Sequence, residues 1–163
     1  MTTTTYHAVR VTYDSARDFD ETRARFDELV PLLDPAVTID LVVRGASWAD
    51  VERAVDTRTG PLGLVAIARI DQGALLTLSG HPLDATLYLV GNPLIARRLI
   101  ELDSAAALYA PFRVVVFRDD AGVHIAYDKP STVLASLGST SIDQIARDLD
   151  DKIAAAAERA ASA

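Results

Sequence analysis

The sequence contains no cysteine, and only one methionine and one tryptophan, among its 163 residues. The absence of cysteine excludes disulfide bonds, thiolate nucleophiles, and zinc or iron–sulfur sites that depend on cysteine ligands. No apolar run approaches the roughly 20 residues that a membrane-spanning helix needs. The first residues, 1–6, also lack the basic start and apolar core of a signal peptide. We therefore expect a soluble chain that stays in the cytoplasm and has no membrane partner.

Lysine is scarce, because only Lys129 and Lys152 among the 16 basic residues are not arginine. Acidic residues outnumber basic ones and give a net charge of −7. This charge argues against a nucleic acid partner, since phosphate binding requires clustered Lys and Arg. The abundant arginine, alanine and aspartate are typical of a GC-rich bacterial genome. Half of the residues are apolar, so residues 1–163 are expected to fold as one domain with a sizeable core.

Two helix starts can be identified in the first third of the chain. Residues 18–21, Asp-Phe-Asp-Glu, resemble a capping box, and Pro31 is expected to bend or end the helix that follows. Residues 47–50, Ser-Trp-Ala-Asp, form a second cap, and Thr-Gly-Pro at 59–61 ends that helix. The apolar segment 37–43 between them fits a strand or a loop.

Alternation of apolar and polar residues predicts the strands. The predicted strands are 6–13, 63–71, 85–90, 111–118 and 123–128. Within 63–71 the even-numbered residues from Leu64 to Ile70 are apolar and are expected to share one face. Asp-Asp-Ala-Gly at 119–122 is a specific signal for a hairpin between the last two strands.

Two helices are predicted in the second half of the chain. One runs from Pro93 to about Asp103, and the other begins with a cap at 141–144. The alanine-rich tail, 154–163, is expected to fray. Hairpins mixed with helices favour the α+β class, with an antiparallel sheet of about four to six strands covered by helices on one face.

The turn Gly91-Asn92-Pro93 is the first candidate site, because it joins a strand to a helix. A free helix N-terminus can bind an anion. However, glycine permits the sharp exit, asparagine is a good N-cap, and proline suits the first helical position. A phosphate loop would also need further glycines and a Lys-Ser/Thr pair, which are absent. Helix initiation therefore explains the turn.

Metal and nucleophile motifs are missing. His7, His81 and His124 are scattered and have no partner at HExxH or HxH spacing, so no metal site is predicted. No GxSxG elbow surrounds any serine. No cofactor is predicted.

One group of polar residues could form a small-molecule site. Tyr109 and Arg113 begin one strand of the predicted hairpin, and Asp128 and Ser131 end the other. Arg113 and Asp128 are expected to form a cross-strand ion pair, worth up to about 1 kcal/mol. Alternatively Arg113, Asp128 and the Ser131 hydroxyl lie at the mouth of an apolar pocket. With Asn92 and Tyr109, they are the predicted ligand-binding residues.

Four segments in order resemble a known family. These segments are 90–96 (Val-Gly-Asn-Pro-Leu-Ile-Ala), 108–113 (Leu-Tyr-Ala-Pro-Phe-Arg), 127–132 (Tyr-Asp-Lys-Pro-Ser-Thr) and 146–153 (Ala-Arg-Asp-Leu-Asp-Asp-Lys-Ile). With Gly63-Leu64 and Arg69-Ile-Asp71, they look like the family labelled domain of unknown function 302, over roughly positions 30–155. The resemblance implies a compact bacterial or archaeal α+β domain with an antiparallel sheet that forms dimers. It implies no agreed activity and no catalytic residues.

The sequence departs from this family at two points. Relatives tend to have His-Asp-Pro near 101–104 and a histidine in place of Pro93. This chain has neither histidine.

Three functions are consistent with these features. The first is a non-enzymatic homodimeric module that binds a small molecule. The second is an acid–base enzyme, a small hydrolase or isomerase, with Asp71 or Asp128 as the base and Arg113 holding an anionic substrate; it requires a buried carboxylate. The third is a structural protein-interaction module, which requires an apolar patch on the uncovered face of the sheet.

Overall fold

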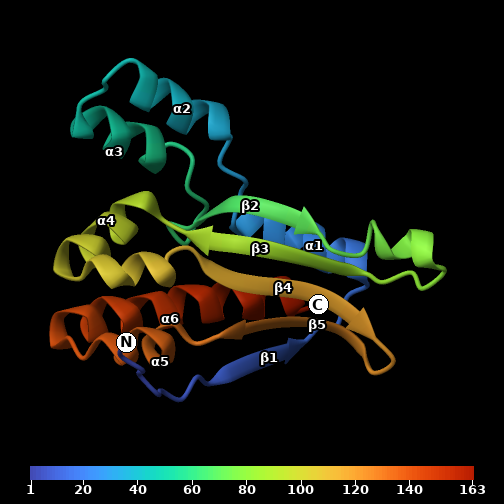
Figure 1. Ribbon diagram of the computed structural model, residues 1–163. Helices are drawn as coiled ribbons and strands as arrows, with labels where there is room; N and C mark the ends of the chain where they lie inside the picture. Colours follow the sequence, from blue (N-terminus) through green and yellow to red (C-terminus); the bar gives the residue numbers. More distant parts are fainter.

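The computed structural model describes residues 1–163, which form one five-stranded antiparallel sheet with helices (Figure 1). The strands are β1 (Arg10–Asp14), β2 (Val65–Asp71), β3 (Ala85–Gly91), β4 (Phe112–Asp119) and β5 (Gly122–Asp128). The α-helices are α1 (Phe19–Leu29), α2 (Pro35–Val43), α3 (Trp48–Asp56), α4 (Pro93–Leu102), α5 (Pro130–Leu134) and α6 (Thr140–Ala161). Short 3₁₀ helices are η1 (Leu76–Ser79), η2 (Ser104–Leu108) and η3 (Ala135–Leu137). The strand order is β1-β5-β4-β3-β2, and the predicted α+β class is confirmed.

The helices α1 and α6 pack against one face of the sheet and against each other (Figure 1). The core lies between these layers. The sheet contributes Tyr88, Val90, Val114 and Ile125 to it, and every one of these side chains is inaccessible or nearly so. The opposite face, turned toward the viewer in Figure 1, has no helix in front of it. No helix in the structure has both the length and the apolar character needed to cross a membrane.

The predicted helix starts at 18–21 and 47–50 are confirmed, but the predicted cap at 141–144 is wrong, because α6 begins at Thr140 after Ser139, which makes no side-chain capping hydrogen bond. The Asp18 carboxylate accepts a hydrogen bond from the backbone N–H of Glu21 at 2.8 Å, and α1 ends at Leu29, two residues before Pro31. Ser47 and Asp50 form a complete capping box at the start of α3. Local side-chain chemistry therefore decides where these helices begin.

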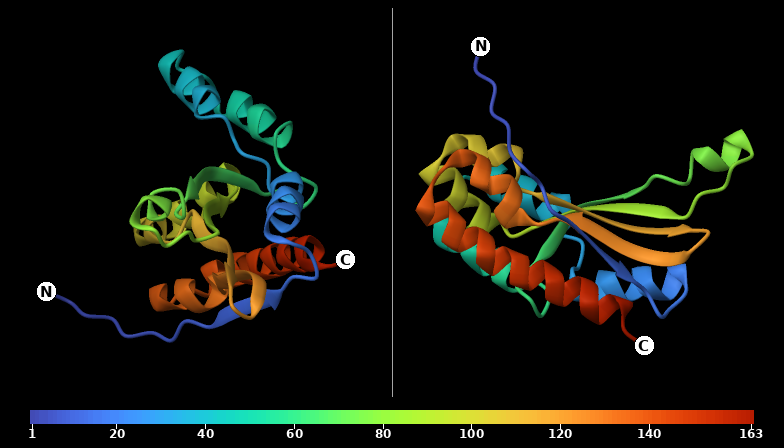
Figure 2. Two further views of the ribbon diagram at one scale, coloured as in Figure 1. Left: turned by 90° about the vertical axis from the view of Figure 1, so that its right-hand side faces the viewer. Right: turned by 90° about the horizontal axis from the view of Figure 1, so that it is seen from below.

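The segment 37–43 is neither strand nor loop, because it lies within helix α2. Asp34 caps this helix by accepting from the N–H of Ala36, and Pro35 occupies the first turn. These start signals outweigh the apolar composition. With α3, helix α2 forms a hairpin that projects from the sheet (Figures 1 and 2). Its side chains Ile39, Val42 and Val43 are 61%, 75% and 81% exposed.

Two further expectations are wrong. The tail does not fray, because α6 continues to Ala161, and four of its last alanines are buried. Their small side chains allow close packing, and the carbonyl of Ala161 accepts from the N–H of Ala16 at 2.9 Å. Along β2, the predicted single-face alternation is interrupted by a register shift between Ala66 and Ala68. As a result Ala66 is buried, but Ile70 is 44% exposed.

Candidate functional site

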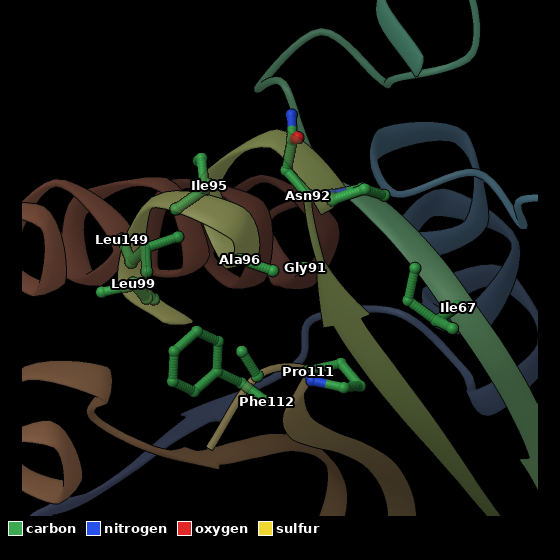
Figure 3. Close-up of a pocket in the computed structure, with 11 residues that line it drawn as sticks. Ile67, Gly91, Asn92, Ile95, Ala96, Leu99, Pro111, Phe112 and Leu149 are labelled. Carbon is green, nitrogen blue, oxygen red and sulfur yellow. The ribbon is translucent and has the colours of Figure 1, made fainter. Parts of the chain in front are cut away.

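An apolar cavity of about 230 Å³ lies where β3 passes into α4 (Figure 3). Its wall combines the first turns of α4, the start of β4, one residue of β2 and one of α6. The apolar lining is formed by Ile67, Pro93, Ile95, Ala96, Leu99, Ala110, Pro111, Phe112 and Leu149. These residues lie far apart in the sequence, and the fold brings them together.

Asn92, a predicted ligand-binding residue, lines this cavity but is fully engaged elsewhere. Its Oδ1 accepts a hydrogen bond from the backbone N–H of Leu94 at 2.8 Å and so caps α4. Its Nδ2 donates to the carbonyl of Gly63 at 2.9 Å. In Figure 3 the amide points away from the cavity. Helix initiation is thus its role, and the cavity can recognise only apolar groups.

The predicted ion pair between Arg113 and Asp128 does not form. Asp128 instead accepts two hydrogen bonds from Arg10, at 2.9 and 3.2 Å. Arg10 lies directly opposite Asp128 in the β1–β5 ladder and takes both of its carboxylate oxygens, whereas the β4–β5 ladder ends one pair short of Arg113 and Asp128. Arg113 is left without a side-chain partner.

Arg113 and Asp128 border a groove of about 370 Å³ on the open face of the sheet. Leu87, Val115 and Phe117 form its apolar floor. Charged side chains border this apolar floor, so the open face of the sheet combines apolar and charged groups.

Tyr109 lies with Arg113 and Asp128 around a second, smaller cavity of about 110 Å³. Its hydroxyl hydrogen-bonds that of Ser136 at 2.9 Å, and its ring meets Tyr6 edge to face at 6.2 Å between centroids. Three of the five predicted residues therefore come together here.

Ser131 does not join them. Its hydroxyl donates to Asp150 of α6 at 2.5 Å, and its N–H donates to the same carboxylate at 2.9 Å. The Lys129 ammonium lies 3.6 Å from Asp150. Ser131 thus fastens α5 to α6, because Asp150 is buried and needs these partners.

The acid–base hypothesis lacks the buried carboxylate that it requires. Asp71 is exposed, and its Oδ1 accepts from the N–H groups of Gly73 and Ala74. Asp128 is only partly buried and is paired with Arg10. Asp150 is buried, but its oxygens are held by Ser131.

His124 has a structural environment that its sequence position did not reveal. Its Nδ1 lies 2.9 Å from Asp14, and its Nε2 lies 3.0 Å from Asp119. Burial alone would lower the pKa of His124, but the two carboxylates outweigh burial and raise this pKa above its ordinary value. No group of three or more His, Asp or Glu side chains in the structure could hold a metal ion.

The comparison with protein families identifies the chain. The model described as "Domain of unknown function DUF302" matches residues 39–160. The chain belongs to the DUF302 family. The match begins at 39 rather than at about 30, and it ends at 160 rather than at about 155.

A solved structure supports the fold of this DUF302 chain. The crystal structure of an uncharacterised conserved DUF302 protein from Bacillus stearothermophilus is similar, with a TM-score of 0.66 and 18% identity. The match covers 93% of this chain and 97% of that one. No curated protein matches the chain.

Proposed function

We propose that this DUF302 chain is a non-enzymatic homodimeric module that binds a small apolar molecule in the cavity between β3, α4 and β4. One observation carries the proposal. Three of the four segments that resemble the family, 90–96, 108–113 and 146–153, contribute to the cavity wall. The fold thus gathers the family-like segments around one space.

The cavity limits the size and polarity of the ligand. An engineered apolar cavity of about 150 Å³ is large enough to bind benzene. The volume of about 230 Å³ therefore suits a molecule of one ring or a short branched chain. Because the side-chain amide of Asn92 is already paired, a polar ligand would lose its hydrogen bonds to water without replacement.

Methyl NMR with toluene as the probe tests the cavity. We expect saturable shifts of the Ile67, Ile95 and Leu99 methyl groups. Ala96→Leu fills the space and should weaken binding at least about tenfold. Ala49→Leu adds the same atoms to an exposed position of α3 and should leave binding unchanged. The absence of saturable shifts, or equal binding by the Ala96→Leu variant, would overturn the proposal.

The homodimer part rests on the open face of the sheet. Leu87, Val115 and Phe117 line the groove there and are half-buried within one chain. Five strands about 4.8 Å apart, with about 3.4 Å per residue, present roughly 500 Å². A stable interface buries about 800 Å² per partner. We propose that the loop between β2 and β3 contributes the remaining interface area, because its residues Leu75 and Leu78 are strongly exposed.

Light scattering over a dilution series tests the dimer. We expect the wild type to be a dimer at about micromolar concentration. Val115→Lys places a charge at the centre of the open face and should give a folded monomer. Val43→Lys, on exposed α2, should remain a dimer. A monomeric wild type, or a dimeric Val115→Lys variant, would contradict the proposed interface.

A further inference from the structure

A third cavity, of about 290 Å³, lies at the other end of β3, beside the first turns of α1. Unlike the apolar cavity, it is lined mainly by charged and polar groups. Arg23 and Asp20 come from α1, Asp71 ends β2, and Thr86 begins β3. Asp84 and Arg118 complete the polar lining.

Two polar groups of this region lack a partner. The Nε of Arg23 is buried and forms no hydrogen bond, although the same guanidinium reaches Asp20 at 3.1 Å through its Nη2. Thr86 is only 5% exposed and lines the cavity, and its hydroxyl forms no hydrogen bond within the chain. Buried polar groups are normally hydrogen-bonded, so the unpaired Thr86 hydroxyl, which belongs to a lining residue of the cavity, indicates a missing partner. The Arg23 Nε is covered by protein atoms and does not face the cavity.

Charges of both signs face the same space. Asp71 uses Oδ1 for the N–H groups of Gly73 and Ala74, which leaves Oδ2 free. Arg118 pairs with Asp84 at 3.2 Å, and its guanidinium lies over the ring of Phe19. A lone anion would meet three carboxylates here, and a lone cation would meet two guanidinium groups. A ligand that carries both charges avoids either repulsion.

The backbone holds the two sides of the cavity in place. A Cβ atom on Gly73 would lie 1.6 Å from the carbonyl oxygen of Leu83, so only glycine permits this close approach. The N–H of Arg118 donates to the carbonyl of Asp84 at 2.9 Å. Asp71 and Asp84 therefore stand at a fixed neck of the β2–β3 loop.

We propose that this cavity binds a small zwitterion of the α-amino acid class. The ligand carboxylate accepts a hydrogen bond from the Thr86 hydroxyl and pairs with the Arg23 guanidinium, and the ligand ammonium pairs with Asp71 Oδ2. The volume of about 290 Å³ accommodates a free amino acid with a small side chain. This site is separate from the apolar cavity and does not depend on the proposed function.

Isothermal titration calorimetry with glycine, L-serine and L-glutamine tests the site. We expect saturable binding of at least one of them. N-acetylglycine lacks the ammonium group and glycinamide lacks the carboxylate, so each should bind at least about tenfold more weakly than glycine. Equal binding of N-acetylglycine would show an anion site only and would overturn the proposal, as would no binding at about 10 mM amino acid.

Matched variants distinguish loss of the proposed amino acid site from a non-specific effect of changing the charge of the protein. Asp71→Asn keeps an oxygen for Gly73 and Ala74 but removes the negative charge, and Arg23→Gln removes the positive charge of the guanidinium. Both should weaken binding at least about tenfold. Asp40→Asn and Arg25→Gln make the same changes at exposed helix positions and should have no effect. Toluene binding in the apolar cavity should persist in all four variants. If the control variants lose amino acid binding as much as the site variants do, the proposed amino acid site is wrong.

Discussion

The two ends of β3 differ in how their polar groups are satisfied. At the Gly91 end, both parts of the Asn92 amide are hydrogen-bonded within the chain, and the neighbouring cavity is apolar. At the Thr86 end, Arg23 Nε and the Thr86 hydroxyl have no partner, and the neighbouring cavity is charged. One strand of seven residues thus separates a surface for an apolar ligand from a surface for a polar one.

The charged character of the Thr86 end continues across to the open face. Ala85 pairs with Phe117, Phe117 with His124, and His124 with Asp14 along the ladder. His124 lies between the carboxylates of Asp14 and Asp119 on that side. Electrostatic effects on stability should therefore arise mainly at this end.

The largest expected effect is at the apolar end. Leu99→Ala removes a side chain that is fully buried and should lower the free energy of unfolding by about 2–5 kcal/mol. Leu102→Ala on the same helix, at a half-exposed position, is the control and should cost much less. Urea denaturation measures both. Similar losses for the two variants would show that the Leu99 side chain is not in a packed environment.

The next effect concerns Asn92, which caps α4 beside the apolar cavity. Asn92→Ala removes the cap of α4 and leaves the carbonyl of Gly63 without its donor. The free energy of unfolding should fall by about 1–3 kcal/mol in urea denaturation. Asn92→Asp retains the cap but not the donor to Gly63, and its loss should be smaller. If the Asn92→Ala variant is as stable as the wild type, the two hydrogen bonds of Asn92 do not stabilise the fold.

A smaller effect is expected from pH at the charged end. Because the folded state raises the pKa of His124, this group stabilises the fold fully below its unfolded pKa of about 6.5. The stabilisation is lost as pH rises through the folded pKa. Urea midpoints measured from about pH 6 to pH 9 should therefore fall more in the wild type than in His124→Gln. If the wild type and His124→Gln have identical pH profiles, protonation of His124 does not stabilise the fold.

The smallest effect is expected at Thr86. Thr86→Val replaces an unpaired hydroxyl with a methyl group of similar shape, so the free energy of unfolding should stay within about 0.5 kcal/mol or rise. Thr22→Val is the contrasting variant, because the buried Thr22 hydroxyl donates to the carbonyl of Asp18 at 2.6 Å. Loss of this hydrogen bond should lower the free energy of unfolding. Urea denaturation again provides the comparison. A clear loss for Thr86→Val would mean that its hydroxyl has a partner in the native protein.

The sequence predicted those features that depend on neighbouring residues. The caps at Asp18, Ser47 and Asn92 are local, and so is the hairpin at 119–122. In contrast, the partner of Asp128 depends on strand register. Arg10 is 118 residues away in sequence, and no local pattern links the two.

The candidate site was only partly predictable for the same reason. Tyr109, Arg113 and Asp128 do come together, because the hairpin places its open ends side by side. Ser131 is diverted to Asp150, since a buried carboxylate on α6 needs a donor. The apolar cavity depends on Ile67, Phe112 and Leu149, whose apolar character looks the same in sequence as that of any core residue.

The most direct test of the account is a crystal structure of the protein under xenon pressure. Xenon enters dry apolar cavities and has no favourable interaction with charged, hydrated ones. We predict a xenon peak in the cavity beside Leu99 and Phe112, and ordered water without xenon beside Arg23 and Thr86. Water in the first cavity, or xenon in the second, would contradict the central claim that the two ends of β3 offer sites of opposite polarity.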